Sequence, residues 1–240
     1  MHQHAPATDP FDLASRVLYR DGMVLVIDKP AGVPVHSGPK GGPVLEDGFD
    51  VLRFGLPNSP GLAHRLDKDT AGCLVLGRHR KALALLGKLF ASGAVEKTYW
   101  AVTVGGPPAD EGTIEAPLAK RDAQRGWFMM VDPAGQPAVT TYRVLGRGAG
   151  LAWLELSPKT GRTHQLRVHC AHLGMPILGD PVYGRASANG PRLHLLARSV
   201  VLPLSRNRPP IAVTAPVPVH MAAALEACGL PLAARAGSAA

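Results

Sequence analysis

Short runs of alternating apolar and polar residues dominate the chain and predict β-strands. Residues 18–20 and 23–27 flank the dipeptide Asp21-Gly22, which is typical of a hairpin turn. Pro30 ends the second run, because proline has no amide hydrogen to donate to a β-ladder. Further strands are predicted at residues 73–77, 99–104, 127–131, 139–145, 151–156 and 193–204, which Gly, Pro and Asp residues separate.

Other segments have the spacing of amphipathic helices. The clearest covers residues 80–90, where apolar residues recur three or four positions apart until Ser92-Gly93 stops the pattern. Residues 163–173 are predicted to form a second helix that ends at Gly174. Shorter helices are predicted at residues 44–54 and 218–228.

Strands outnumber helices and mostly follow one another without a regular strand–helix alternation. This order favours an α+β fold, with a mixed, mainly antiparallel central sheet flanked by helices. Neither an internal repeat nor a clear linker is visible, so we predict one domain over residues 11–231. Residues 1–10 and 232–240 are small, polar or Ala-rich, and we expect them to be disordered tails.

The charge of the chain indicates an acidic partner. The 240 residues carry a formal net charge of +8, and nucleic acid is the simplest partner for such a protein. We predict no membrane association, because the basic residues are dispersed and no apolar run is long enough to span a bilayer. The first residues lack the pattern of a signal peptide, which predicts a cytoplasmic location. The three cysteines share no Cys-x-x-Cys spacing, which argues against a disulfide framework or a zinc site.

Charged residues gather most densely at residues 64–72, which read His-Arg-Leu-Asp-Lys-Asp-Thr-Ala-Gly. Asp67 lies between Arg65 and Lys68, and nearby cations favour the ionised form of a carboxylate. We therefore expect Asp67 to act as a charged acceptor or nucleophile. The same cations can bind a phosphate backbone, so this segment combines a reactive carboxylate with a surface for a polyanion.

Three further segments place polar residues among apolar ones. In residues 96–101, strand alternation puts Lys97 and Tyr99 on one face. In residues 160–169, helical spacing puts His164 and Arg167 on one side, and Arg162 falls in the first turn, where backbone amides favour anions. Arg167 is expected to be half-buried and to need a carboxylate partner, for which Asp67 is a candidate. The last segment covers residues 178–184.

Together these segments resemble the RluA-type RNA pseudouridine synthases. The resemblance extends over residues 16–204, with the motifs in the order and at about the spacing of that family. There are two departures: Ala71 replaces a usual serine, and too few residues precede Asp28 for the S4-like RNA-binding domain of many relatives. The five motifs are Asp28-Lys29-Pro30-Ala31-Gly32, His64-Arg65-Leu66-Asp67-x-x-Thr70-x-Gly72, Lys97-Thr98-Tyr99-Trp100-Ala101, Gly161-Arg162-Thr163-His164-Gln165-Leu166-Arg167-Val168-His169 and Gly179-Asp180-Pro181-x-Tyr183-Gly184.

The resemblance implies an active-site cleft across the sheet and a catalytic role for Asp67. In uridine isomerisation this aspartate acts either as a nucleophile or as a base that removes a sugar proton, and the sequence leaves both routes open. Arg167 would pair with Asp67, and Tyr99 would stack on the target base after the base is flipped out of the RNA. Arg65 would fill the vacated stack or bind the neighbouring phosphate. The family uses no metal and no organic cofactor.

The expected partner is a stem-loop of tRNA or ribosomal RNA, bound by a monomer through shape and splayed bases. Alternatively, His64 has a structural role and forms a hydrogen bond that holds the turn of the motif. Lys29 is either a phosphate contact or a charge at a strand end. In addition to Arg65, the candidate RNA-binding residues are His64, Lys29, Lys97, Arg162 and His164.

Three other interpretations compete with this one. His164, His169 and His172 do not fall on one helix face, so a metal site with Cys170 is not favoured. The segment Asp67-Lys68-Asp69-Thr70 superficially resembles the motif of an Asp-x-Asp phosphotransferase. That chemistry needs Mg²⁺ and a fold in which strands and helices alternate. A catalytically inactive RNA-binding module of the same fold is the third interpretation.

Overall fold

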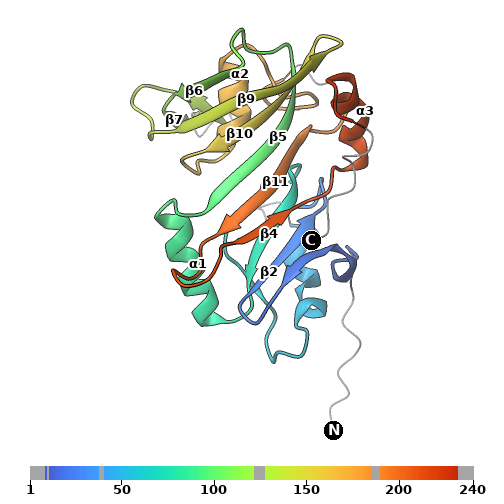
Figure 1. Ribbon diagram of the computed structural model, residues 1–240, viewed down its shortest axis with the longest axis vertical. Helices are drawn as coiled ribbons and strands as arrows, with labels where there is room; N and C mark the ends of the chain where they lie inside the picture. Colours follow the sequence, from blue (N-terminus) through green and yellow to red (C-terminus); the bar gives the residue numbers. More distant parts are fainter. Residues whose placement is uncertain (1–8, 10, 38–40, 122–127, 185–189, 232–240) are drawn as a thin grey trace. The chain divides into compact units, whose positions relative to one another are not determined.

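The computed structural model describes residues 9, 11–37, 41–121, 128–184 and 190–231 (Figure 1). The chain forms two compact units, which we describe separately. Unit 1 comprises residues 1–96 and 199–215, and unit 2 comprises residues 97–198 and 216–240. Within the described ranges, no helix is long and apolar enough to cross a membrane.

Unit 1 is built on an antiparallel sheet whose first two strands form the predicted hairpin. Oδ1 of Asp21 accepts the backbone N–H groups of Met23 and Val24, each at 2.7 Å, and so fixes the turn. Strand β2 pairs along its whole length with β4, with Lys29 opposite Gly72. The elements are η1 (Ala14–Arg16), β1 (Val17–Arg20), β2 (Val24–Lys29), η2 (Leu45–Leu52), β3 (Gly61–Leu62), β4 (Ala71–Gly77), α1 (Arg80–Ala91) and β12 (Ile211–Thr214).

Helix α1 lies beside β4 and confirms the predicted helix at residues 80–90 (Figure 1). Its first turn is capped by His79, whose Nδ1 accepts the Ala82 N–H at 3.2 Å. Leu83 packs so closely on Gly77 that a Cβ there would lie 2.7 Å from its side chain. The helix predicted at residues 44–54 is present as the shorter 3-10 helix η2.

Unit 2 contains an antiparallel sheet with the strand order β5-β10-β9-β6. The strand predictions at 99–104, 139–145 and 151–156 are confirmed, and each observed strand is longer. Strands β6 and β7 were not predicted from the sequence. The elements are β5 (Glu96–Val104), β6 (Glu111–Glu115), β7 (Leu118–Lys120), β8 (Met129–Val131), β9 (Val139–Gly148), β10 (Leu151–Pro158), α2 (Gln165–His172) and α3 (Val219–Ala227), and β11 (Leu195–Leu202) continues into unit 1.

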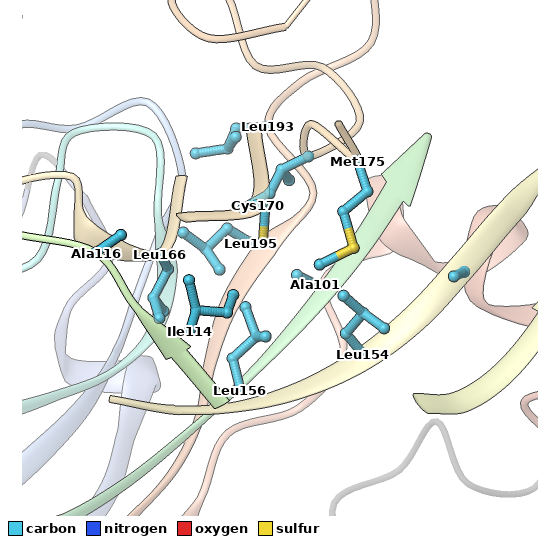
Figure 2. Packing of buried hydrophobic residues seen from close by; sticks show 12 residues of the cluster. Ala101, Ile114, Ala116, Leu154, Leu156, Leu166, Cys170, Met175, Leu193 and Leu195 are labelled. Carbon is cyan, nitrogen blue, oxygen red and sulfur yellow. The ribbon is translucent and has the colours of Figure 1, made fainter. Parts of the chain in front are cut away.

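The core of unit 2 lies between one face of this sheet and helix α2 (Figure 2). Leu154 and Leu156 of β10 and Ala101 of β5 point to the same side, where they meet Leu166 and Cys170 of α2. Burying these side chains removes apolar surface from water and so stabilises the unit. The predicted α+β class with a mainly antiparallel sheet is therefore confirmed. The single domain predicted over residues 11–231 stays a prediction, and the predicted tails, apart from Asp9, lie outside the described residues.

Candidate active site

The loop that carries Asp67 connects β3 to β4 in unit 1. The Thr70 N–H donates to the Asp67 carbonyl at 3.2 Å, which closes a turn over residues 67–70. Leu66 is buried, Asp67 is half-buried, and Arg65 and Lys68 are exposed. The apolar residue thus anchors the loop, and the carboxylate is flanked by two cations that face solvent.

The side chain of Lys29 forms hydrogen bonds with the backbone of this loop. This side chain is fully buried, and Nζ donates to the carbonyls of Pro30, Lys68 and Thr70 at 2.8, 2.9 and 2.9 Å. Burial lowers the pKa of Lys29 to about 8, against the opposing attraction of Asp69, Asp67 and Asp28. An ammonium has three hydrogens, and these three carbonyls use them all. The burial and these three bonds favour the alternative interpretation of Lys29 as a charge at a strand end, and its contact with RNA stays a prediction.

His64 and Arg65 precede the carboxylate and differ in role. Nε2 of His64 accepts the Val75 N–H at 3.0 Å, and its ring stacks on Phe90 with centroids 4.6 Å apart. These contacts fit the predicted structural role of His64, which ties the loop to β4 and α1. Arg65 is exposed on the same loop, so its predicted contact with RNA is sterically open.

Arg167 lies in unit 2 on helix α2 and is almost fully buried. Its Nε and Nη2 each donate to Asp180, to Oδ2 and Oδ1 respectively, at 2.8 Å. Asp180 also accepts the N–H groups of Val182 and Tyr183. Although burial raises it, the pKa of Asp180 is lowered overall by Arg167 and these amides. The expected carboxylate partner exists, but it is Asp180, which the sequence did not single out. The pairing of Arg167 with Asp67 stays a prediction.

His164 lies immediately before α2, which begins at Gln165 and not at residue 163. Its backbone is left-handed, with φ of 53°. The side chain is only 6% exposed, and Nδ1 lies 2.9 Å from the hydroxyl of Tyr183. His164 therefore offers little surface to RNA, and its contacts indicate an internal role that the helical pattern did not reveal.

The remaining predicted residues of unit 2 lie on β5 and just before α2. Tyr99 is half-buried and packs against the core cluster of unit 2. Lys97 is half-buried, and burial lowers its pKa. Arg162 is exposed, and its Nε donates to the Pro137 carbonyl at 3.1 Å. Lys97 and Arg162 therefore stay candidates for RNA contact.

The histidine–cysteine group considered for metal binding is occupied by internal contacts. The ring nitrogens of His169 lie 3.0 Å from Thr140 Oγ1 and 3.1 Å from the Ala116 carbonyl. Burial raises the pKa of the Cys170 thiol to about 12, so it stays protonated. A metal ligand needs a free imidazole nitrogen or a thiolate, and these two residues offer neither.

Each of the two units contains one set of the polar side chains predicted from the sequence. In unit 1, a rigid loop presents a half-buried carboxylate between exposed cations, as a nucleophile or base acting on a polyanion requires. In unit 2, a buried guanidinium is held by two bonds, and Tyr99 lies on a neighbouring strand. Asp180, Tyr183 and the buried position of Lys29 are the features that the sequence did not reveal, although all three residues stand in the quoted motifs.

Comparisons with known proteins agree on one family. Residues 23–172 match the family model described as RNA pseudouridylate synthase. An uncharacterised RNA pseudouridine synthase of Zymomonas mobilis is 44% identical over 209 residues, which cover 86% of this chain and 95% of that one. The ribosomal large subunit pseudouridine synthase D of Xanthomonas campestris is 44% identical over 184 residues, covering 74% of this chain and 54% of that one.

The solved structure of human RNA pseudouridylate synthase domain containing 4 superposes with a TM-score of 0.77 and 29% identity, covering 92% of this chain and 95% of that one. The family-model match includes strands β5, β6, β9 and β10 of unit 2 as well as the Asp67 loop. These comparisons favour an isomerase over the Asp-x-Asp phosphotransferase and the inactive binding module. The chain therefore belongs to the RNA pseudouridylate synthase family.

Proposed function

We propose that this protein isomerises specific uridines to pseudouridine in structured stem-loops of tRNA or ribosomal RNA, with Asp67 as the catalytic aspartate. The observation that carries the proposal is the Asp67 loop. Its backbone is closed by a turn and fastened by a buried lysine, so the half-buried carboxylate has a fixed position. Fixed groups avoid reorganisation during a reaction, which is the condition for efficient catalysis.

The reaction needs one carboxylate and no external reagent. The N1–C1′ bond breaks, the uracil rotates, and C5 bonds to C1′. The proton on C5 leaves to solvent, and N1, released from the sugar, gains a proton, so atoms and charge balance. Asp67 serves either as the nucleophile or as the base that takes a sugar proton. In both routes a neutral amide at this position cannot replace the carboxylate.

The other residues of the proposed site act on the RNA and on the carboxylate. Arg65, exposed beside Asp67, would bind a phosphate or occupy the space left by the flipped base. Tyr99 would stack on the target uracil. Arg167 would orient Asp67, and its own guanidinium is held in place by two hydrogen bonds to Asp180.

Release of tritium from RNA that contains 5-tritiated uridine tests the proposal directly. Pools of tRNA and ribosomal RNA are incubated separately with the protein, because the substrate class is part of the proposal. We expect release from at least one pool, and no release from either pool with folded wild-type protein would contradict it.

The variant Asp67→Asn should lose activity by about 10²-fold or more, the range for removal of a proton-transfer group. RNA binding should be retained, because the cations remain. Asp69→Asn is the matched control, since it removes an equal charge two residues away on the same loop. If both variants lose activity equally, the loop's total charge matters and Asp67 has no special role.

We also propose that the protein acts as a monomer in the cytoplasm. Sedimentation tests the oligomeric state, and cell fractionation tests the location.

A further inference from the structure

We infer that His164 and Tyr183 are positioning residues that hold Arg167 in place by cross-linking helix α2, the turn after Asp180 and the β7–β8 hairpin. The inference rests on the proposed function, because it takes Arg167 to belong to the active site. All residues concerned lie in unit 2.

Tyr183 makes contacts with each of these elements. Its hydroxyl accepts the N–H of Met129 in β8 at 2.9 Å and lies 2.9 Å from Nδ1 of His164. Its own N–H donates to Asp180 at 3.0 Å. The guanidinium of Arg167 lies over its ring, 5.2 Å from the centroid, in the arrangement of a cation–π contact. The side chain and backbone of Tyr183 therefore connect strand β8, the start of helix α2 and the Arg167–Asp180 ion pair.

The two hydrogen bonds of the Tyr183 hydroxyl place different demands on its oxygen and its hydrogen. A tyrosine oxygen donates one hydrogen and accepts from others. The Met129 amide can only donate, so the oxygen accepts there. The hydroxyl hydrogen is thus available for the bond with Nδ1 of His164. Phenylalanine keeps the ring beneath Arg167 but loses both bonds, so it separates the two functions of the side chain.

The backbone of His164 indicates that its ring is needed. A φ of 53° in the left-handed region disfavours residues with a Cβ and suits glycine. The chain nevertheless carries a histidine here, 6% exposed and bonded to Tyr183. The imidazole thus supplies a contact that glycine, the residue best suited to this backbone, cannot make.

These contacts bear on Arg167 because its two ends are attached to different elements. Its backbone belongs to α2, three residues after His164, while its guanidinium is fixed to Asp180. The bond between His164 and Tyr183 is a second link between the same two elements, so it prevents them from sliding past each other. Misplacement of a reacting group by about 1 Å can cost a reaction about 100-fold.

The same hydroxyl also fixes the β7–β8 hairpin. This hairpin exposes Lys120, Arg121 and Met130, the last with 42% of its surface accessible. Two cations and a flexible apolar side chain suit contact with an RNA strand. Tyr183 therefore connects a surface able to touch the substrate with the guanidinium of the proposed site.

Tyr183→Phe and His164→Gly test the inference in the full chain. Both should lower the single-turnover rate on the responsive RNA pool by about 10- to 100-fold, with KM within about twofold of the wild-type value. Glycine suits the left-handed backbone of residue 164 but deletes a buried ring, so the rate of His164→Gly is compared per folded molecule, with the folded fraction taken from urea unfolding. The control Tyr19→Phe also deletes a bonded hydroxyl, which donates to Asp21 at 3.0 Å, and should keep the wild-type rate.

A double-mutant cycle decides whether Tyr183 acts through Arg167. In an Arg167→Lys background, Tyr183→Phe should have no further effect on the rate, since the group it positions is already altered. An equal rate loss in both backgrounds would overturn the inference. So would variants whose unfolding midpoint falls while the rate per folded molecule stays that of the wild type.

Amide hydrogen exchange at Met129 gives a readout that does not depend on activity. Tyr183→Phe should accelerate it, because the amide loses its acceptor. Unchanged exchange would contradict the cross-link. If the wild-type protein releases no tritium, the proposed function fails, and this exchange measurement alone decides whether the cross-link exists.

Discussion

Two buried cations, Lys29 in unit 1 and Arg167 in unit 2, have hydrogen-bond partners of different kinds. Lys29 donates to three backbone carbonyls. Arg167 donates to one carboxylate, Asp180, through two parallel bonds. The first arrangement shapes a loop, and the second neutralises a charge.

The difference assigns separate tasks to the two cations. Carbonyls are dipoles and leave the ammonium with its net charge, so Lys29 still attracts Asp67 and Asp69. Asp180 cancels most of the charge of Arg167, which makes this guanidinium a source of directed hydrogen bonds more than a source of field. We therefore expect Lys29 to stabilise the Asp67 loop of unit 1, and we expect Arg167 to act in unit 2 through directed hydrogen bonds.

Removing the carboxylate from the ion pair should have the largest effect. Asp180→Asn removes the carboxylate that accepts two hydrogen bonds from the buried Arg167, and loss of one partner of such a pair costs about 3–5 kcal/mol of stability. Urea unfolding measures the loss, and turnover of the folded fraction should also fall. The control Asp110→Asn breaks an exposed pair with Arg147 and should cost less than about 1 kcal/mol. A loss no larger than that of the control would mean that Arg167 does not depend on Asp180.

Lys29→Met should cost somewhat less, about 2–3 kcal/mol. Three carbonyls lose the Lys29 donor, at about 1–3 kcal/mol for one left without a partner, but the Lys68 carbonyl keeps the Gly32 N–H and the removal of a buried charge offsets part of the loss. Activity of the folded protein should fall as well, because the loop loses both its fastening and its nearby charge. Lys68→Met, exposed on the same loop, is the control for urea unfolding and tritium release. A destabilised variant with full activity would restrict Lys29 to a structural role.

Mild acid should weaken unit 2 through His169. The Ala116 carbonyl accepts from Nε2–H of His169, and in the neutral form Nδ1 accepts the hydroxyl hydrogen of Thr140. Burial lowers the pKa of His169 below 6.5, so the unfolded chain binds the proton more readily than the folded one. Stability from this group is present above pH 6.5 and is lost as the pH falls through the folded pKa, by at most about 1.4 kcal/mol per pH unit.

The measurement is urea unfolding of the wild type and His169→Gln between about pH 7.5 and pH 5. The variant should show a flatter pH dependence, whereas His172→Gln, exposed on the same helix, should keep most of the wild-type slope. Burial also lowers the pKa values of His194 and His220 in unit 2. The free energy of unfolding of His169→Gln should therefore still depend on pH, although less steeply than that of the wild type. Equal slopes for all three proteins would show that His169 is not held neutral.

The elements with strong local patterns could be predicted from the sequence. Strands β2 and β4 are continuous apolar runs, and α1 has clear helical spacing with a glycine stop, so local preference and burial agree. Strand β6 was missed because it is an edge strand that buries only Ile114 and exposes Glu111, Thr113 and Glu115. So few buried positions give almost no periodic signal.

The site could be predicted in its residue types but not in its pairings. Lys29 reaches carbonyls 39 and 41 residues away, and backbone acceptors leave no trace in the identity of a side chain. Arg167 was expected to need a carboxylate, and the quoted motifs contain three, those of Asp28, Asp67 and Asp180. Only the turn that brings Asp180 beside α2 decides the choice, and that turn is set by tertiary packing.

The smallest expected effect belongs to Arg65, which faces solvent and holds no element in place. Arg65→Ala should leave stability unchanged and weaken RNA binding. Because each phosphate contact releases counterions, the slope of log affinity against log salt should fall by about 0.7–0.9. Lys81→Ala, an exposed cation of α1, is the control for a general loss of charge. The measurement is RNA binding by both variants across a salt series. If both variants change the slope equally, Arg65 acts only through net charge. An unchanged slope for Arg65→Ala excludes its contact with a phosphate.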